Sequence, residues 1–204
     1  MTTHIIGIAG ASCSGKTTLA ARIAEHATAG TATLISLDSY YRDLSHLTPD
    51  ARAEWNFDAP NALDDELLLK HLKILLSGTP VYIPVYDFST HTRIALTERA
   101  NPATFVIMEG LFVLYWPQIR DIVETKVFIS VPDEVCLERR IARDTRERGR
   151  TEESVRQQYA TTVRPMYEKY CRPTAKFADL QLSGQDDADE LASAVLKKVE
   201  ASEK

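Results

Sequence analysis

An eight-residue segment near the start of the chain carries glycine, lysine and threonine at the spacing of a phosphate-binding loop. Residues 10–17 read Gly-Ala-Ser-Cys-Ser-Gly-Lys-Thr and match the pattern G-x-x-x-x-G-K-[ST]. In such a loop, backbone N–H groups point into one concavity, the lysine neutralises the β- and γ-phosphates, and the threonine hydroxyl binds Mg²⁺. We expect the phosphates of a nucleotide to bind along this loop, at Gly10, Ala11, Ser12, Cys13, Ser14, Gly15, Lys16, Thr17 and Thr18.

The segments on either side of this loop have the composition of a buried strand and of a helix. Residues 4–9 form an apolar run, and residues 17–24 read Thr-Thr-Leu-Ala-Ala-Arg-Ile-Ala. A helix that begins at the loop adds unpaired N–H groups and partial positive charge, so this context favours a nucleotide phosphate site over a chance match. A helix N-terminus also stabilises a thiolate. We nevertheless expect Cys13 to be a small filler rather than a redox-sensitive switch.

Two carboxylates follow apolar runs that are predicted to be strands of a parallel sheet. Asp38 follows residues 34–37, and Glu109 follows residues 105–108. Ligands of open parallel sheets bind beyond the carboxyl ends of the strands. We expect Glu109 to reach Mg²⁺ directly or through water, beside Thr17. Asp38 is predicted to lie across from the γ-phosphate, close enough to share the metal and to accept the proton of an acceptor hydroxyl.

An unusual share of the basic residues falls in one short segment of this acidic chain. The six arginines are Arg139, Arg140, Arg143, Arg146, Arg148 and Arg150. Steps of four, three and four place four of them on one helical face, unless the helix ends near Gly149 and leaves Arg150 on the following loop. The acidic residues among them predict that part of this surface is an ordinary solvated face; they are Glu138, Asp144 and Glu147. The favoured interpretation is a lid that covers the phosphates, with Arg143 and Arg148 as catalytic charges.

Composition excludes several other classes of protein. The 204 residues carry a formal net charge of −5, which argues against a general nucleic-acid binder. No apolar run approaches the length of a membrane span, and the first residues lack the basic region of a secretory signal. The three cysteines have no metal-ligand spacing. We expect a protein of the reducing cytoplasm that binds neither nucleic acid nor membrane.

Short apolar runs alternate with helical patterns, which predicts βαβ units and a parallel sheet. The predicted strands are Ile5–Ala9, Thr33–Leu37, Phe105–Met108, Lys126–Val131 and Ala178–Leu182. The predicted helices are Thr17–Ala29, Asp64–Leu76, Pro132–Glu147, Glu152–Cys171 and Asp187–Ala201. Residues 79–98 alternate like an inserted hairpin, and residues 133–158 form the arginine-rich lid. The expected fold is α/β, a three-layer P-loop NTPase fold in a single domain over residues 1–204.

Together these segments resemble the uridine/cytidine kinases. The likeness rests on the phosphate-binding loop and on motifs that follow it in order: Ser-Leu-Asp-Ser-Tyr-Tyr-Arg at 36–42, Asn-Phe-Asp at 56–58, Ile-Pro-Val-Tyr-Asp-Phe-Ser-Thr-His-Thr-Arg at 83–93, Met-Glu-Gly at 108–110, Arg-Asp at 143–144 with Glu-Arg-Gly-Arg at 147–150, and Pro-Thr-Ala-Lys-Phe-Ala-Asp at 173–179. The resemblance implies phosphoryl transfer from ATP or GTP to the 5′-hydroxyl of uridine or cytidine in pyrimidine salvage. It also implies a homo-oligomer, a tetramer or dimer.

The same resemblance assigns roles by position. Asp38 matches the family's catalytic acid, and Asp58 with Arg140 matches the residues that hold the ribose hydroxyls. Tyr86 and His91 match the residues that recognise the base. The remaining positions are implied to line the substrate site or to contact the nucleoside from the lid: Tyr41, Phe88, Arg148, Arg150 and Gln158.

Three positions near Asp58 depart from the family pattern and leave the choice of acceptor open. They are Trp55, Ala59 and Asn61. One alternative is a kinase of the same superfamily that acts on a pentose phosphate or pantothenate, although Arg93 is the one evident basic residue near the hairpin that would suit such an acceptor. The other alternative is a nucleotide-dependent regulator without catalysis, which would be expected to lack the acids at the strand ends.

Overall fold

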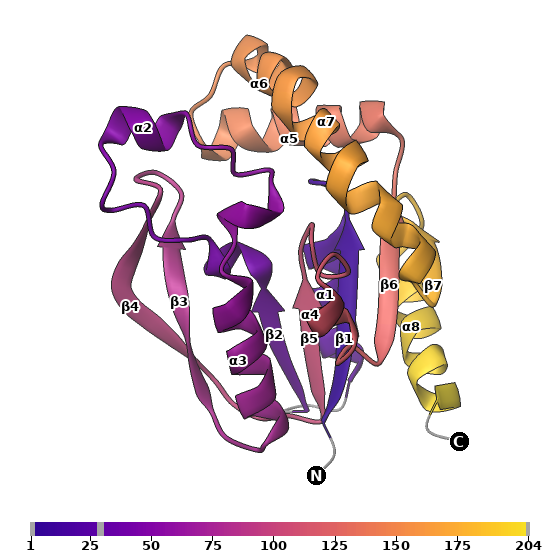
Figure 1. Ribbon diagram of the computed structural model, residues 1–204. Helices are drawn as coiled ribbons and strands as arrows, with labels where there is room; N and C mark the ends of the chain where they lie inside the picture. The colour runs from indigo at the N-terminus through magenta and orange to yellow at the C-terminus, as the bar shows by residue number, and fades with distance from the viewer. Residues whose placement is uncertain (1–2, 28–30, 203–204) are drawn as a thin grey trace.

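The centre of the protein is a parallel β-sheet. The computed structural model describes residues 3–27 and 31–202, and these contain a five-stranded sheet with the strand order β2-β5-β1-β6-β7 (Figure 1). The strands are β1 (His4–Gly10), β2 (Ala32–Ser36), β5 (Phe105–Glu109), β6 (Thr125–Ser130) and β7 (Leu180–Ser183). All residues of β1 are buried because helices cover both faces of the sheet, as its apolar sequence predicts. The parallel sheet is confirmed.

Helices cover the two faces of the sheet and complete three layers. On one face, α1 (Lys16–His26) packs beside α8 (Ala188–Ser202), and both contribute to one apolar cluster with Ile6 and Ile8 of β1. On the other face, α3 (Asp65–Leu76) and α4 (Pro117–Arg120) pack on a second cluster that includes Ile5 of β1 (Figure 1). The α/β fold class is thereby confirmed. The predicted end of the first helix, Ala29, lies outside the described residues.

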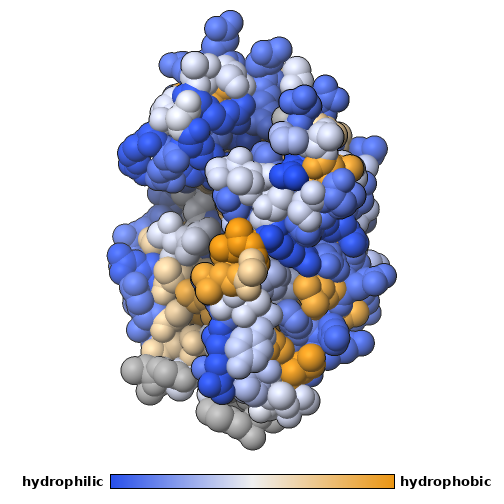
Figure 2. Space-filling view, turned by 90° about the vertical axis from the view of Figure 1, so that its left-hand side faces the viewer, coloured by the Kyte–Doolittle hydropathy of each residue, from blue (hydrophilic) through white to orange (hydrophobic). Residues whose placement is uncertain are grey.

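The predicted hairpin is present beside the sheet. Strands β3 (Val81–Asp87) and β4 (Thr92–Ala100) pair antiparallel, with a register irregularity between Pro84 and Val85. Pairing continues two residues further than the sequence suggested, to Ala100. The outer side of the hairpin is partly apolar, since Ile94 and Leu96 are exposed. Figure 2, which views this side of the molecule, shows hydrophobic residues gathered in the middle of the face.

A second group of helices lies above the carboxyl ends of the strands (Figure 1). Helix α5 (Asp133–Glu147) is followed by a turn and by α6 (Glu152–Gln158). The helical course from α6 continues through two π-helical turns at Tyr159–Val163 and Tyr167–Cys171, separated by the short α7 (Arg164–Met166). Pro165 lies between the two π turns and has no N–H to give to a regular ladder. A helix at residues 152–171 was predicted, but not its irregularity.

Short segments connect these elements on the hairpin side. They are the 3₁₀ turn η1 (Leu37–Tyr40), helix α2 (Pro49–Ala53) and the 3₁₀ turn η2 (Pro60–Ala62). A further 3₁₀ segment, Arg172–Phe177, leads into β7 at the other edge of the sheet. The sequence pattern did not reveal them. Within residues 3–27 and 31–202, no helix combines the length and apolar character needed to cross a membrane.

Candidate active site

The loop between β1 and α1 has the backbone of an anion cradle. Gly10 has φ 152° and lies so close to β6 that a Cβ there would be 2.3 Å from the Ile129 carbonyl oxygen. Cys13 and Gly15 also have positive φ, at 62° and 101°, and Gly15 is the N-cap of α1. Lys16 is buried, and its Nζ donates to the Ala11 carbonyl oxygen at 2.7 Å. The lysine is therefore held inside the curl of the loop.

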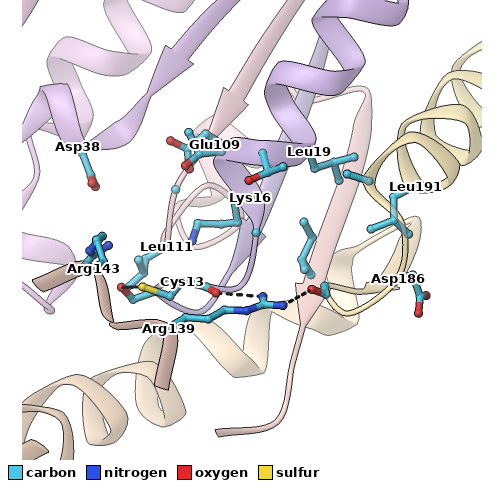
Figure 3. A pocket seen from close by; sticks show the side chains of 18 of the residues that line it. Cys13, Lys16, Leu19, Asp38, Glu109, Leu111, Arg139, Arg143, Asp186 and Leu191 are labelled. Carbon is cyan, nitrogen blue, oxygen red and sulfur yellow. Dashed lines mark hydrogen bonds between the residues drawn. The ribbon is translucent and has the colours of Figure 1, made fainter. Parts of the chain in front are cut away.

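A cavity of about 530 Å³ opens in front of this loop (Figure 3). We call it the donor cavity. Six of the nine predicted loop residues line it: Ser12, Cys13, Gly15, Lys16, Thr17 and Thr18. Gly10, Ala11 and Ser14 do not line it; Ser14 is fully buried and Gly10 and Ala11 are also buried behind the loop. Asp38, Glu109 and Arg143 line the opposite side. The strand-end acids and the arginine-rich helix α5 thus meet the phosphate-binding loop around one volume.

Glu109 ends β5 at the edge of the donor cavity and is buried. The hydroxyl of Ser36, the last residue of the neighbouring β2, donates to Glu109 Oε1 at 2.8 Å. Burial raises the pKa of Glu109, the charge of Lys16 opposes this, and the nearby charge of Asp38 adds to the rise. A cation bound beside Glu109 would favour its ionised form and so oppose this rise in its pKa.

Glu109→Gln is expected to stabilise the protein in the absence of nucleotide and metal. Because the folded state raises the pKa of Glu109, it binds this proton more tightly than the unfolded chain, and stability falls as the pH rises from the ordinary glutamate pKa through the raised one. The neutral amide removes this cost. At neutral pH we expect the Tm to rise by about 2–4 °C, the shift that ~1 kcal/mol produces in a domain of this size.

Thermal unfolding followed across pH checks this expectation. The two proteins should converge in Tm as the pH falls below the ordinary glutamate pKa, where the wild-type side chain is neutral in both states. Glu200→Gln, which changes an exposed residue of α8, is the matched control and should leave the Tm unchanged. A lower Tm for Glu109→Gln at neutral pH would contradict the expectation.

A second, smaller cavity of about 110 Å³ adjoins the first. We call it the acceptor cavity. Ser12, Asp38, Leu111 and Arg143 line both cavities. Asp38 belongs to η1, directly after β2, and its backbone N–H donates to Ser36 Oγ at 3.3 Å. The carboxylate therefore lies where a group bound in the acceptor cavity would face phosphates bound in the donor cavity.

Aromatic rings form one wall of the acceptor cavity. Tyr41, Phe57, Phe88 and His91 line it, and the His91 ring stacks on Phe57 with the centroids 4.3 Å apart. Tyr86 does not line it: its ring packs against Tyr41 and Phe88, each at a centroid distance of 5.2 Å. Alternation along β3 correctly placed Tyr86 and Phe88 near each other, but Tyr86 is the deeper of the two.

Two polar atoms of this group of aromatic side chains are buried without a hydrogen-bond partner among the described residues. They are the hydroxyl of Tyr86 and Nδ1 of His91. Burial lowers the pKa of His91, and the charge of Arg148 lowers it further, so the imidazole is neutral at pH 7 and can donate or accept. Unsatisfied buried polar groups are uncommon in native proteins and call for an explanation such as a ligand.

The opposite wall carries charged and amide groups. Burial raises the pKa of Asp58, against the opposing charge of Arg140. Arg140 is itself buried and donates to Ser12 Oγ and to Gln158 Oε1, both at 3.2 Å. Arg140 thus connects the phosphate-binding loop to α6, and it lines the same cavity as Asp58.

Arg148 and Arg150 lie in the turn between α5 and α6. Arg148 lines the acceptor cavity, with its guanidinium carbon 5.2 Å from the centroid of the Phe88 ring. Arg150 lies beyond the end of α5 at Glu147, and so is not on the helical face of the other arginines. It donates to Gln158 Oε1 and borders an outer groove instead of the acceptor cavity.

Some lining residues were missed by sequence reasoning. Arg139 donates to the carbonyl oxygens of Cys13 at 3.4 Å and Gly184 at 3.1 Å, and so ties the loop to the segment after β7 (Figure 3). Gly184 and Asp186 line the donor cavity, and Phe57 lines the acceptor cavity. Arg139 and Phe57 belonged to segments already noted, the arginine run and the motif at 56–58. Residues 183–187 carried no clear signal.

The three positions near Asp58 that depart from the family pattern lie outside both cavities. Ala59 is buried, whereas Asn61 is exposed and its carbonyl oxygen accepts from Arg42 Nε at 3.2 Å. Trp55 borders the outer groove along α6. Asp58 and Gln158 border the same groove.

Comparison with known proteins identifies relatives over most of the chain. The model of the Phosphoribulokinase / Uridine kinase family matches residues 5–189. A protein named uridine kinase from Staphylococcus epidermidis is 45% identical over 178 residues, covering 87% of this chain and 86% of its own length. A protein of the same name from Chloroflexus aurantiacus is 41% identical over 197 residues, covering 97% of this chain and 94% of its own length.

Solved structures show the same fold at lower sequence identity. A putative fructose transport system kinase from Silicibacter sp. TM1040 superposes with a TM-score of 0.72 at 22% identity, covering 88% of this chain and 89% of its own. Phosphoribulokinase from Rhodobacter spheroides gives a TM-score of 0.68 at 16% identity, covering 89% of this chain and 70% of its own.

Proposed function

We propose that this chain, which belongs to the Phosphoribulokinase / Uridine kinase family, transfers the γ-phosphoryl group of ATP or GTP to the 5′-hydroxyl of uridine or cytidine. Membership of the family makes the chain a kinase with a nucleotide phosphate donor. The observation that carries the finer proposal is the pair of adjoining cavities with Asp38 between them. One cavity has the phosphate-binding loop, and the other has aromatic rings and polar groups suited to a nucleoside.

The residues of the donor cavity fit Mg²⁺ held together with a substrate. Thr17, Asp38 and Glu109 offer a hydroxyl and two carboxylates to one volume. In the described part of the chain, no three acidic, histidine or cysteine side chains form a metal site of their own. Mg²⁺ in kinases is bound by one or two carboxylates plus substrate phosphates and water, so such a partial set suits it. The ion would neutralise phosphate charge, while Lys16 and Arg143 supply the rest.

The acceptor cavity offers recognition for each part of a nucleoside. The Asp58 carboxylate can accept hydrogen bonds from both vicinal hydroxyls of ribose. The unsatisfied Tyr86 hydroxyl and the neutral His91 ring can bind the edge of a pyrimidine, and Phe88 offers a surface for its face. The Tyr86 ring packs against Tyr41 and Phe88, both of which line the cavity.

We assign the lid role to α5, α6 and the turn between them. Arg143 lines both cavities and Arg148 lines the acceptor cavity, so closure of these helices would bring guanidinium groups to the transferring phosphoryl group and exclude water. The hairpin β3–β4 supplies the facing wall through Phe88.

A substrate panel tests the proposal. Turnover is measured with ATP and with GTP on uridine, cytidine, ribulose 5-phosphate and pantothenate, and the phosphorylated position is identified by NMR. We expect kcat/KM for uridine or cytidine to exceed that for the other acceptors by at least about 10³-fold, because sites built for a substrate's polar groups reject analogues that leave those groups unpaired. 5′-Deoxyuridine should bind as an inhibitor and not be phosphorylated.

Two outcomes would overturn the proposal. Selective phosphorylation of ribulose 5-phosphate or pantothenate would assign the chain to another acceptor class within the family. Tight donor binding without turnover of any acceptor would indicate a nucleotide-dependent regulator.

A further inference from the structure

Asp144 of α5 is a fully buried carboxylate surrounded by four arginines, although its sequence context predicted a solvated face. Arg143 approaches closest, with Nη2 at 2.8 Å and Nε at 2.9 Å from Oδ1. The other three lie at longer ion-pair distances from the carboxylate: Arg140 at 3.6 Å, Arg148 at 3.8 Å and Arg150 at 3.5 Å. The expected surface position is wrong because these guanidinium groups enclose the side chain.

The backbone of Asp144 is tied to the same arginines. Its carbonyl oxygen accepts hydrogen bonds from the N–H groups of Arg148 at 3.1 Å and Arg150 at 3.2 Å. These bonds close the end of α5 and fix the turn through Gly149, which has φ 62°. One residue therefore sets both the path of the turn and the direction of the side chains that it carries.

The arrangement is poorly suited to stability alone. Four positive groups face one negative group, and Asp144 Oδ2 and Arg140 Nε have no hydrogen-bond partner among the described residues. Burial lowers the pKa of Arg148, and the charge of Arg143 lowers it further. Buried ionic groups of this kind contribute little net stability because desolvation offsets their attraction. The excess positive charge is instead directed at the cavities, since Arg143 lines both and Arg140 and Arg148 line the acceptor cavity.

We infer that Asp144 is a positioning residue of the kinase reaction, which gathers the lid arginines and aims them at the phosphoryl group passing from the donor cavity to the acceptor cavity. This inference rests on the proposed function. Asp144 lines neither cavity and so acts through its arginine partners. Its charge holds mutually repelling guanidinium groups together before substrates arrive, which is preorganisation of the electrostatic site.

Asp144→Asn tests the inference by removing the charge at nearly constant shape. We expect kcat to fall about 100-fold, because arginines that are no longer held in place stabilise the transition state less. We expect Kd for ATP to change by less than about 3-fold, because the phosphate-binding loop still binds the donor. Asp133→Asn is the matched control: Asp133 lies on the same helix and pairs with Arg164 at 2.9 Å, and neither residue lines a cavity. It should retain wild-type kcat and Kd.

A double-mutant cycle separates positioning from a general structural effect. If Asp144 acts through Arg143, then Arg143→Gln combined with Asp144→Asn should lose little more activity than Arg143→Gln alone. A structural defect would multiply the two losses and overturn the inference. A folded Asp144→Asn protein that keeps more than about a third of wild-type kcat would also overturn it. Such a decrease in kcat is smaller than the decrease that removal of one aligned hydrogen-bond donor causes.

A second variant keeps the test open if Asp144→Asn does not fold. Asp144→Glu retains the charge but moves the carboxylate by one methylene. We expect about a 10-fold loss of kcat, because small displacements of the catalytic arginines are costly, and a Tm lowered by only a few degrees by the added methylene. Wild-type kcat in this variant would show that the exact position of the carboxylate does not matter for the reaction. Should wild-type protein phosphorylate no nucleoside, the proposed function fails. The ratio of variant to wild-type ATP hydrolysis then tests Asp144 without an acceptor.

Discussion

Asp38→Asn is expected to lower kcat for uridine and cytidine by about 10³-fold, within the range that a positioned general base contributes. Asp38 lines both cavities, so its carboxylate can accept the proton of an acceptor hydroxyl while that oxygen approaches the γ-phosphorus. Asparagine keeps the shape and one hydrogen-bond acceptor but cannot take the proton. Because the transition state is loose, alignment of the hydroxyl contributes to the loss as well.

Donor binding separates this role from a general disturbance of the site. Steady-state turnover gives kcat, and calorimetry gives Kd for ATP with Mg²⁺, which we expect to change by less than about 10-fold because the phosphate-binding loop is intact. Asp121→Asn, an exposed change at the end of α4 that lines neither cavity, is the control and should behave as wild type. Turnover of Asp38→Asn near the wild-type rate would remove Asp38 from the chemical step.

Local patterns were enough to predict the sheet, the hairpin and the phosphate-binding loop. Strand β1 is almost continuously apolar and fully buried because helices cover both faces of the sheet, and the loop is fixed by the positive-φ positions around Gly15. The position of Asp38 also followed from topology, since β2 and β5 pair directly and bring Asp38 and Glu109 to one edge. Each of these inferences depends on neighbours in the chain or on the strand ends.

Depth and long-range packing could not be predicted in the same way. Period-two alternation gives the face of a strand residue but not its distance from a cavity, so the place of Tyr86 behind Tyr41 and Phe88 was not apparent. Asp144 looked like one member of a charged helical surface, yet it is fully buried. Two of the four arginines that enclose it, Arg148 and Arg150, return to it after α5 has ended, and a helical projection cannot show that return.

Asp58→Ala is expected to erase most of the discrimination between ribose and 2′-deoxyribose acceptors. The carboxylate can accept hydrogen bonds from two vicinal hydroxyls, and 2′-deoxyuridine offers it only one. We expect kcat/KM for uridine to fall about 10³-fold and that for 2′-deoxyuridine only about 10-fold, since loss of a buried polar contact is costly chiefly for the substrate that used it. Measuring both acceptors on each protein gives the ratio directly. An equal loss for the two would mean that Asp58 does not contact the 2′-hydroxyl.

The pH dependence of uridine binding provides an independent check on Asp58. Burial raises its pKa, and the charge of Arg140 only partly offsets that rise. The ionised form, which accepts both hydroxyl bonds, is therefore lost at a higher pH than for an exposed aspartate, and KM for uridine should rise as the pH falls through this raised pKa. Asp58→Asn cannot titrate, so its KM is expected to be higher than wild type at neutral pH and flat across the same range. A parallel rise in KM for both proteins would show that the titrating group is not Asp58. Glu109, whose pKa is also raised, would then be the next carboxylate to replace by its amide.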